Sequence, residues 1–383
     1  MDALAENLRQ QIRAHGNWLG FDAFMEAALY WPRLGYYTGG GRPFEADYVT
    51  APMLGPWLGQ AIWRLSAPLQ TDSTFRIREF GGGRGDLAAS LMACARAAQG
   101  PVLTMEMLER SADLAEQQRQ TTQGLGPISW LRCGAPGFSG LVVANEVIDA
   151  MPVKCLEWRG SREVVEWGIG LRGEKLVWRD RPASPECVEL VLAREAAASE
   201  RGLPWEPGYR LEWCPWTGPW LSSLADTINT GAVLLIDYGY AEPELDHPGR
   251  TQGTLCAHFR HQRFDDPEQW LMRVGQQDLT AHVNFSQIAR EAEQAGFAVA
   301  GFLTQARFLI NNGLLESVQM ALSDTVDPVA RARLLQGVHM MLMESEMGEV
   351  FKVMLLTKNL PPATHEHLRA AFETGDRRES LTL

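Results

Sequence analysis

Apolar residues follow two rhythms in the middle of the chain, and their alternation predicts a layered α/β domain. Short apolar runs, typical of buried strands, alternate with stretches in which apolar residues recur at helical spacing. We expect strands over residues 75–80, 101–109, 127–132, 140–145, 231–240, 297–303 and 350–358. We expect helices over residues 84–98, 110–120 and 284–296. Because the strand runs are apolar on both sides, they favour a parallel sheet covered by helices on both faces.

Three regions depart from this alternation. The start of the chain has apolar residues at helical spacing and then a loop rich in Gly and Pro, and the stretch from 154 predicts an antiparallel meander followed by a helix. A segment of about forty residues before Asn284 has no clear periodicity, and the end of the chain is polar. We therefore expect a helical cap segment over 1–70, a main domain over 71–358 with insertions at about 154–230 and 240–283, and a loosely ordered tail over 359–383.

Composition narrows the class of protein. The chain has 383 residues, of which 45% are hydrophobic, and a formal net charge of -12. Such a negative surface argues against nucleic-acid binding. No run of about 18 apolar residues predicts a membrane span, and the N-terminus resembles neither a secretory signal nor a transit peptide, so we expect a cytoplasmic location. The six cysteines form no C-x-x-C pair, which favours reduced thiols over disulfides or a metal site.

The stretch "EFGGGRGDLAAS" at residues 79–90 predicts a ligand-binding turn between a strand and a helix. Gly81, Gly83 and Gly85 would adopt positive φ angles without strain and bring bare backbone against a ligand. Dinucleotide sites place another glycine three residues after the second one, but Asp86 occupies that position here. The pattern therefore disfavours a pyrophosphate and favours a ligand without phosphate, although a simple packing turn remains an alternative.

Two acids flank this turn at the expected strand ends. Glu109 follows the second strand, where a carboxylate could accept hydrogen bonds from both ribose hydroxyls, and Glu79 ends the first strand and could face a cationic group. Either acid alone could be a solvated surface residue. Together with the glycine turn, they indicate a pocket for an adenosine with a positively charged tail, a description that S-adenosyl-L-methionine (SAM) fits.

The chain resembles the MidA-like methyltransferases, the family that includes the mitochondrial complex I assembly methyltransferase. The resemblance rests on an ordered series of stretches from about residue 20 to 358: "GYYTGG", "ADYVTAP", "EFGGGRGDL", "LERSADLAEQQR", "VVANEVIDAMPV", "LLIDYGY", "GTLCAHFRH", "DLTAHVNF" and "FKVMLLTK". Two positions depart from the family pattern. Gly82 stands where the family usually has proline or alanine, and Met53 stands where it has glutamate.

The resemblance implies a class I, Rossmann-like fold with a seven-stranded sheet whose last strand is antiparallel, a helical N-terminal segment and an inserted cap. It implies SAM as cofactor and methyl transfer as the activity. Because the mitochondrial relative methylates an arginine of a respiratory-complex subunit, the resemblance also implies a protein substrate, with such a subunit as one candidate. It does not identify the acceptor, and the oligomeric state stays open.

The stretch "ANEVID" holds the candidate catalytic residues. It follows the fourth strand, at the sheet edge where ligands of open α/β sheets bind. Asn145 would meet the cofactor or the acceptor. Glu146 and Asp149 are three residues apart, so on a helix they would share a face and could orient and deprotonate an arginine. The alternative is that either acid only caps the following helix.

Other polar and aromatic residues carry weaker signals. Asp237, at the end of the fifth strand, would hold a loop through backbone amides or face the substrate. His258 and His261 have a spacing that could bind metal, but no third ligand accompanies them, and a cap loop explains them better. His282 is a loop histidine with a secondary general-base alternative. Four tryptophans, Trp205, Trp213, Trp216 and Trp220, would form a hydrophobic floor or else an aromatic wall for a guanidinium.

Three classes of function follow from these observations. A SAM-dependent methyltransferase acting on protein arginine fits best. A nucleotide-cofactor oxidoreductase is disfavoured by Asp86 in the third glycine position. A non-catalytic SAM-binding assembly protein would keep the pocket but not turn over, and Glu146 and Asp149 argue against it without excluding it.

Overall fold

The computed structural model describes residues 2–39 and 49–381, which fall into two compact units. Unit 1 comprises Met1–Tyr48, Asp149–Pro219 and Ala241–Asn284, and unit 2 comprises Val49–Ile148, Trp220–Tyr240 and Phe285–Leu383. The expected cap segment over 1–70 is therefore divided, because residues from Val49 onward group with unit 2. Parts of the "GYYTGG" and "ADYVTAP" stretches lie outside the described residues.

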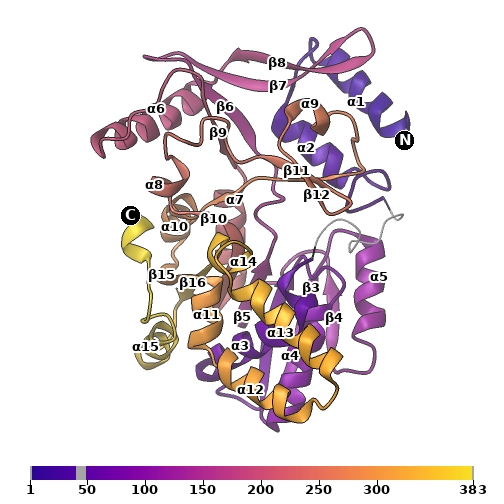
Figure 1. The fold of residues 1–383 in the computed structure, drawn as a ribbon, viewed down its shortest axis with the longest axis vertical. Coiled ribbons are helices and arrows are strands. Elements are labelled where there is room, and N and C mark those ends of the chain that lie inside the picture. The colour runs from indigo at the N-terminus through magenta and orange to yellow at the C-terminus, as the bar shows by residue number, and fades with distance from the viewer. Residues whose placement is uncertain (1, 40–48, 382–383) are drawn as a thin grey trace. The chain divides into compact units, whose positions relative to one another are not determined.

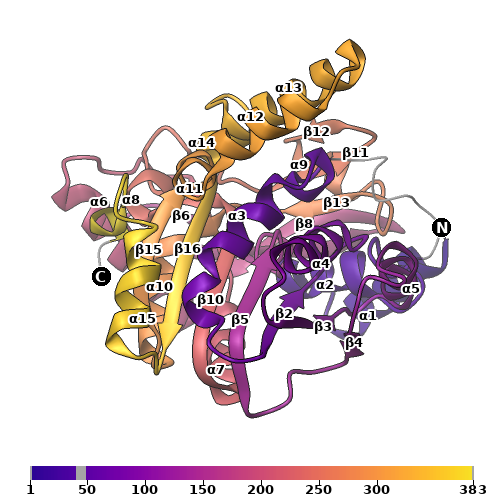
Figure 2. The same ribbon diagram turned by 90° about the horizontal axis from the view of Figure 1, so that it is seen from below.

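Unit 2 is built on a mostly parallel sheet. The path through this sheet follows the order β15-β16-β10-β5-β2-β3-β4, which can be traced across Figure 2. Its strands are β2 (Thr74–Phe80), β3 (Val102–Leu108), β4 (Ile128–Leu131), β5 (Phe138–Asn145), β10 (Ile228–Tyr240), β15 (Ala298–Thr304) and β16 (Phe351–Lys358). The last strand, β16, pairs antiparallel with both neighbours, as the resemblance implies. The path holds seven strands, and the sheet counts an eighth because the two-residue strand β14 (Val283–Asn284) pairs with β10 off this path.

Helices accompany this sheet in unit 2 (Figure 1). They are α3 (Trp57–Leu65), α4 (Asp86–Ala98), α5 (Ala112–Thr121), α7 (Thr217–Thr227), α10 (Phe285–Gln294), α11 (Gln305–Asn311), α12 (Leu314–Asp324), α13 (Pro328–Leu342), α14 (Met347–Val350) and α15 (Pro362–Ala370), with short 3₁₀ turns at Ala51–Leu54, Ala67–Leu69 and Arg378–Leu381. Of these helices, α3, α4, α11, α12, α13, α14 and α15 contribute buried residues to one apolar cluster with the strands of the sheet. Leu58 and Ile62 of α3 and Leu91 of α4 are fully buried in one cluster with strand residues, which explains why residues from 49 onward belong here. None of the helices in the described part of the chain combines the length and the apolarity that a membrane crossing requires.

The C-terminal segment differs from the loosely ordered tail that its polarity predicts. The ring of Phe372 is fully buried and lies 5.8 Å from that of Phe308, and Leu368 and Leu381 are buried as well. Gly301 of β15 provides the space, because a Cβ there would lie 2.3 Å from the Phe372 ring. A few apolar residues in a polar segment are enough to dock it, and periodicity does not reveal them.

Unit 1 contains the antiparallel meander that the sequence predicts, together with the segments on either side of it. One sheet follows the order β1-β7-β6-β9 with β8 beside β7, and another follows β12-β11-β13. The elements are α1 (Asp2–Ala14), β1 (Leu19–Gly20), α2 (Phe21–Tyr30), β6 (Lys154–Trp158), β7 (Val164–Arg172), β8 (Lys175–Pro182), α6 (Pro185–Glu200), β9 (Tyr209–Trp213), α8 (Glu242–Leu245), β11 (Cys256–Phe259), β12 (Gln262–Phe264), α9 (Pro267–Trp270), β13 (Asp278–Thr280) and β14 (Val283–Asn284). The Ser184 hydroxyl accepts a hydrogen bond from the Cys187 amide and caps the N-terminus of α6.

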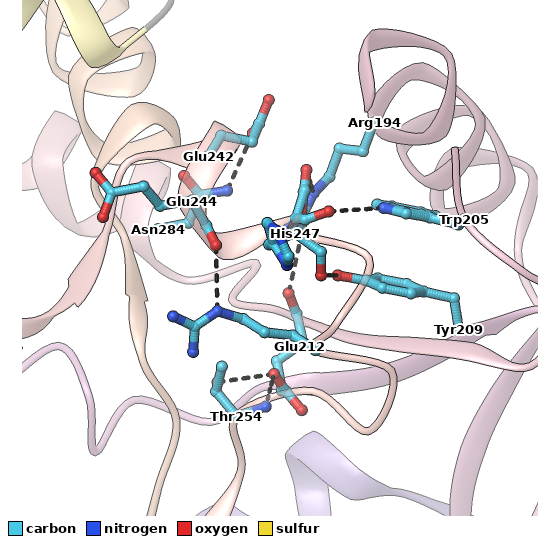
Figure 3. Close-up of polar contacts among 11 residues, drawn as sticks. Arg194, Trp205, Tyr209, Glu212, Glu242, Glu244, His247, Thr254 and Asn284 are labelled. Carbon is cyan, nitrogen blue, oxygen red and sulfur yellow. Dashed lines mark hydrogen bonds and ion pairs between the residues drawn. The ribbon is translucent and has the colours of Figure 1, made fainter. Parts of the chain in front are cut away.

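A buried polar network ties α6 to the loop after α8 (Figure 3). Arg194 donates to both carboxylate oxygens of Asp246, and both side chains are almost fully buried. Trp205 and Tyr209 stack with ring centroids 4.0 Å apart and donate to the carbonyls of Asp246 and His247. The region before Asn284 is thus ordered by these polar contacts together with buried apolar residues such as Leu255, Trp270 and Leu279, which recur at no regular spacing.

Candidate functional site

The glycine turn lies between β2 and α4 and adopts the backbone that the sequence predicts. Gly81, Gly83 and Gly85 have φ angles of 59°, 50° and 91°, all in the left-handed region that favours glycine. The Gly81 amide donates to the carbonyl of Leu108, the last residue of β3, at 3.1 Å. The turn is therefore fixed to the end of the neighbouring strand, and Gly81 stays exposed.

Two contacts explain where side chains are excluded from the turn. A Cβ on Gly82 would lie 2.4 Å from the Met107 methyl carbon, so this protein fills with Met107 the space that a proline or alanine would need. A Cβ on Gly85 would lie 3.2 Å from the Cα of Gln118 on α5. The departure at Gly82 thus reflects local packing against β3.

Glu79 is a buried acid at the end of β2. Its side chain is only 3% exposed, and its Oε2 atom has no hydrogen-bond partner among the described residues. Burial, with the negative charges of Glu109 and Asp86, raises the pKa of Glu79 to about 8. A carboxyl group in this state lacks a cation, and a positively charged ligand would supply one.

Glu109 follows β3 and is half-buried beside the turn. Its Oε1 accepts from the Ser111 amide at 2.8 Å, and its Oε2 accepts from the Gln118 side chain at 3.0 Å. Burial raises the pKa of Glu109, while the hydrogen bonds from Ser111, Gln118 and the Arg110 backbone oppose this shift. A carboxylate has about four acceptor positions, so Glu109 keeps capacity for sugar hydroxyls.

Asn145 and Glu146 lie at the end of β5, on the same sheet edge as the turn. The Asn145 amide donates to Glu146 Oε1 at 3.1 Å, and its Oδ1 atom is buried without a partner among the described residues. Glu146 has a φ of 53°, a strained conformation for a residue other than glycine. Its amide donates to the Ile236 carbonyl at 2.8 Å, which anchors it to β10.

Asp237 holds the segment that follows Glu146. Its Oδ2 accepts from the amides of Val147 and Ile148 at 3.2 and 2.9 Å, and its Oδ1 accepts from its neighbour Tyr238. Asp237 is 1% exposed. Of the two roles considered for it, the structure therefore shows the backbone support.

The expected pairing of Glu146 with Asp149 on one helical turn is wrong. Residues 146–150 form bends and a turn instead of a helix, because the positive φ of Glu146 breaks helical continuity at its first residue. Asp149 is buried and begins a stretch of unit 1, where its carbonyl accepts from the Ala281 amide at 3.1 Å. Helical spacing therefore gives no support for a joint role.

The candidate histidines and tryptophans differ in their local surroundings. His258 Nε2 lies 3.3 Å from the Cys256 sulfur, and the described residues contain no group of three side chains placed to hold a metal. Trp205 is buried in the core of unit 1, whereas Trp216 is 52% exposed. Trp220 belongs to unit 2, where it packs edge-on against Phe80 at the end of β2. A floor or wall made by all four tryptophans stays a prediction.

The edge of unit 2 fits the cofactor that the sequence predicts. An exposed turn of bare backbone, an acid with spare acceptor capacity and a buried acid without a cation are complementary to a nucleoside with a cationic tail. Asp86 at the start of α4 occupies the position where a phosphate would bind, so the residues suit SAM better than a dinucleotide. The individual roles of these residues stay predictions.

Comparison with known proteins agrees with this description. Residues 53–303 match a family of S-adenosyl-L-methionine-dependent methyltransferases. Protein arginine methyltransferase NDUFAF7, mitochondrial, is similar at 29% identity in Mus musculus, covering 94% of this chain and 84% of that protein, and at 28% in Homo sapiens, covering 93% and 82%.

A solved structure from Burkholderia thailandensis, bound to S-adenosyl-homocysteine, is 34% identical with a TM-score of 0.85 and covers 100% of this chain and 97% of that one. The methyltransferase fold and SAM as cofactor are therefore confirmed. The chain belongs to this family of S-adenosyl-L-methionine-dependent methyltransferases.

Proposed function

We propose that this protein transfers a methyl group from SAM to an arginine side chain of a protein partner. The observation that carries the proposal is the geometry of Glu146, an acid held at the carboxyl end of β5 in a strained conformation beside Asn145. Strained residues persist where the surroundings impose them, and they concentrate at active sites. The relatives named protein arginine methyltransferases support arginine as the acceptor.

We assign the cofactor contacts to unit 2. The backbone of Gly81, Gly83 and Gly85 would lie against the adenosine, Glu109 would accept from the ribose hydroxyls, and Glu79 would face the ammonium. Asn145, with its unsatisfied oxygen, would accept a further hydrogen bond from the bound molecule. Each assigned residue offers either a hydrogen-bond acceptor or glycine backbone without a side chain.

The cofactor supplies a methyl group on a sulfonium, which is already activated, so the residues have to align the acceptor and handle a proton. Methylation forms a bond between an arginine nitrogen and the methyl carbon, breaks the carbon–sulfur bond and leaves that electron pair on sulfur. The arginine nitrogen must lose a proton, which its pKa above about 12 opposes. Glu146 would orient the guanidinium and accept this proton. Asp149 remains a second candidate for the same task.

A methyl-transfer assay tests the proposal. The protein is incubated with labelled SAM and arginine-containing basic peptides, and labelled methylarginine is measured after hydrolysis. Glu146→Gln should lower kcat by about a hundredfold or more, with little change in the affinity for S-adenosylhomocysteine. Asp149→Asn, measured in parallel, shows whether that acid contributes.

The outcomes separate the alternatives. Label on arginine supports the proposal. Label on another residue type would show that the acceptor is that residue and not arginine. Cofactor binding without any transfer in a single-turnover assay would favour a non-catalytic assembly protein. The respiratory-complex subunit and the cytoplasmic location stay predictions from the resemblance and the sequence.

A further inference from the structure

We propose that Gln118 is a positioning residue that fixes Glu109 to the glycine turn and thereby sets the affinity of the site for the ribose hydroxyls. The inference rests on the assignment of Glu109 to the ribose made above. Gln118 lies on α5, is completely buried and is not among the residues that the sequence assigns to the cofactor site. It would act through Glu109 without touching the cofactor.

The side-chain amide of Gln118 joins three elements. Its Nε2 donates to the Gly83 carbonyl at 3.0 Å and to Glu109 Oε2 at 3.0 Å. Its Oε1 accepts from the indole nitrogen of Trp130, on β4, at 2.9 Å. The turn after β2 and the acid after β3 are thus held by the same nitrogen atom.

Trp130 fixes which end of the amide faces the site. An indole nitrogen can only donate, so the atom it contacts must be the amide oxygen. The amide nitrogen is then directed to Gly83 and Glu109, which both accept. Reversal of the amide would place two donors against each other at Trp130 and two acceptors against each other at Glu109.

The backbone of α5 is fixed at the same place. Thr122 donates to the Gln118 carbonyl through its amide at 2.9 Å and through its hydroxyl at 2.7 Å. Gly85 allows the close approach, because a Cβ there would lie 3.2 Å from the Gln118 Cα. The Thr122 contacts close the last turn of α5 at Gln118, and the close approach at Gly85 places this turn of the helix directly against the glycine turn.

This arrangement has a consequence for Glu109. Donation by Gln118 favours the ionised, accepting form of a carboxylate that burial opposes. It also restricts the rotation of that carboxylate, so the remaining acceptor positions are fixed before a ligand arrives. Preorganised acceptors recognise a pair of hydroxyl groups with a smaller loss of conformational entropy than mobile ones.

The experiment compares two ligands that differ only in the sugar. Adenosine and 2′,3′-dideoxyadenosine compete with S-adenosylhomocysteine, and the ratio of their dissociation constants measures hydroxyl recognition. The variants are Gln118→Met, which keeps length without hydrogen bonds, Trp130→Phe and Glu109→Gln. Gln120→Met is the matched control, because Gln120 is an exposed glutamine of the same helix.

We expect the ratio to favour adenosine in the unaltered protein and to fall about tenfold in Gln118→Met, since hydrogen bonds to charged groups are among the stronger ones. Trp130→Phe should give a smaller fall, and Gln120→Met none. Equal weakening of both ligands by Gln118→Met would indicate general loosening and overturn the inference. If Gln118→Met does not fold, an unchanged ratio in Trp130→Phe overturns it instead. An unchanged ratio in Glu109→Gln would show that the ribose assignment itself is wrong.

Discussion

The Gln118 side chain donates to Glu109 Oε2 at a distance of 3.0 Å and to the Gly83 carbonyl at the same distance. Gln118 is fully buried, whereas Glu109 is half-buried. A residue of α5 thereby links the glycine turn to the acid at the end of the next strand. The Gln118 side-chain amide therefore connects the backbone and the carboxylate that we assign to the cofactor.

Binding of S-adenosylhomocysteine should release a proton from Glu79. Since burial and nearby acids raise the pKa of Glu79 to about 8, the group is mostly protonated at about pH 7. The cationic tail of the ligand favours the ionised form, so the proton leaves on binding, and the release should vanish as the pH rises above about 8. Calorimetry in buffers of different ionisation enthalpy counts the protons, and Glu79→Gln should abolish this part of the release. An unchanged count in that variant would contradict the assignment.

The raised pKa of Glu79 also makes the unfolding free energy of the cofactor-free protein depend on pH. The pKa in the folded state lies above the ordinary value of 4.5, so the contribution is present below about pH 4.5 and is lost as the pH rises towards about 8. Glu79→Gln should therefore become more stable relative to the unaltered protein across this range. Denaturant unfolding at several pH values measures the difference in unfolding free energy between Glu79→Gln and the unaltered protein. A difference that does not change with pH would show that the pKa of Glu79 is not raised.

Gly83→Val should abolish most cofactor binding. A β-branched residue at a φ of 50° is strained, and its side chain would stand where the adenosine is expected. The strain alone amounts to about 1–2 kcal/mol. Gly124→Val is the matched control, because Gly124 has a φ of 72° and a Cβ there would meet no atom within 4 Å. Equal binding by both variants in calorimetry would show that the adenosine lies elsewhere.

Asp237→Asn should affect turnover more than cofactor affinity. The carboxylate accepts from the amides of Val147 and Ile148, and an asparagine can satisfy only part of this set. We expect a loss of about 1.5–3 kcal/mol in unfolding free energy and a lower kcat, because the segment after Glu146 loses its support. Asp226→Asn, an exposed position on α7, serves as the control. Thermal unfolding and methyl transfer at saturating SAM give the two readouts. A kcat equal to that of the control would show that the support from Asp237 does not matter for turnover.

Arg194→Met should destabilise unit 1 by about 3–5 kcal/mol, since it leaves the buried Asp246 without its cation. The double variant Arg194→Met, Asp246→Leu should recover much of this loss, because the buried pair is then replaced by apolar groups. Denaturant midpoints measure both effects. A double variant no more stable than the single one would show that the network in Figure 3 matters for reasons other than this pair.

Sequence patterns predict residues at strand ends well and buried polar helix residues poorly. Glu79, Glu109 and Asn145 could be placed because each follows an apolar run that ends at the same sheet edge. Gln118 could not, since α5 has few apolar residues and its periodicity does not show which polar residue is buried. The burial of Gln118 arises only when Trp130 and the glycine turn meet it.

Backbone conformation is a second feature that the sequence does not predict. Glu146 and Asp149 have helical spacing, but spacing predicts a shared face only where a helix forms, and a non-glycine positive φ leaves no signal in one sequence. The helices α11 to α14 form between two strands that the sequence predicts, in a stretch for which it predicts no helix. The C-terminal segment docks through single residues such as Phe372. In each case tertiary contacts decide the outcome.

A crystal structure with S-adenosylhomocysteine bound would test the central claim most directly. We expect adenosine against the backbone of residues 81–85, with both sugar hydroxyls within hydrogen-bond distance of the Glu109 carboxylate and the ligand ammonium beside Glu79. Density for the ligand at another part of the chain, or a Glu109 side chain directed away from the sugar, would contradict it.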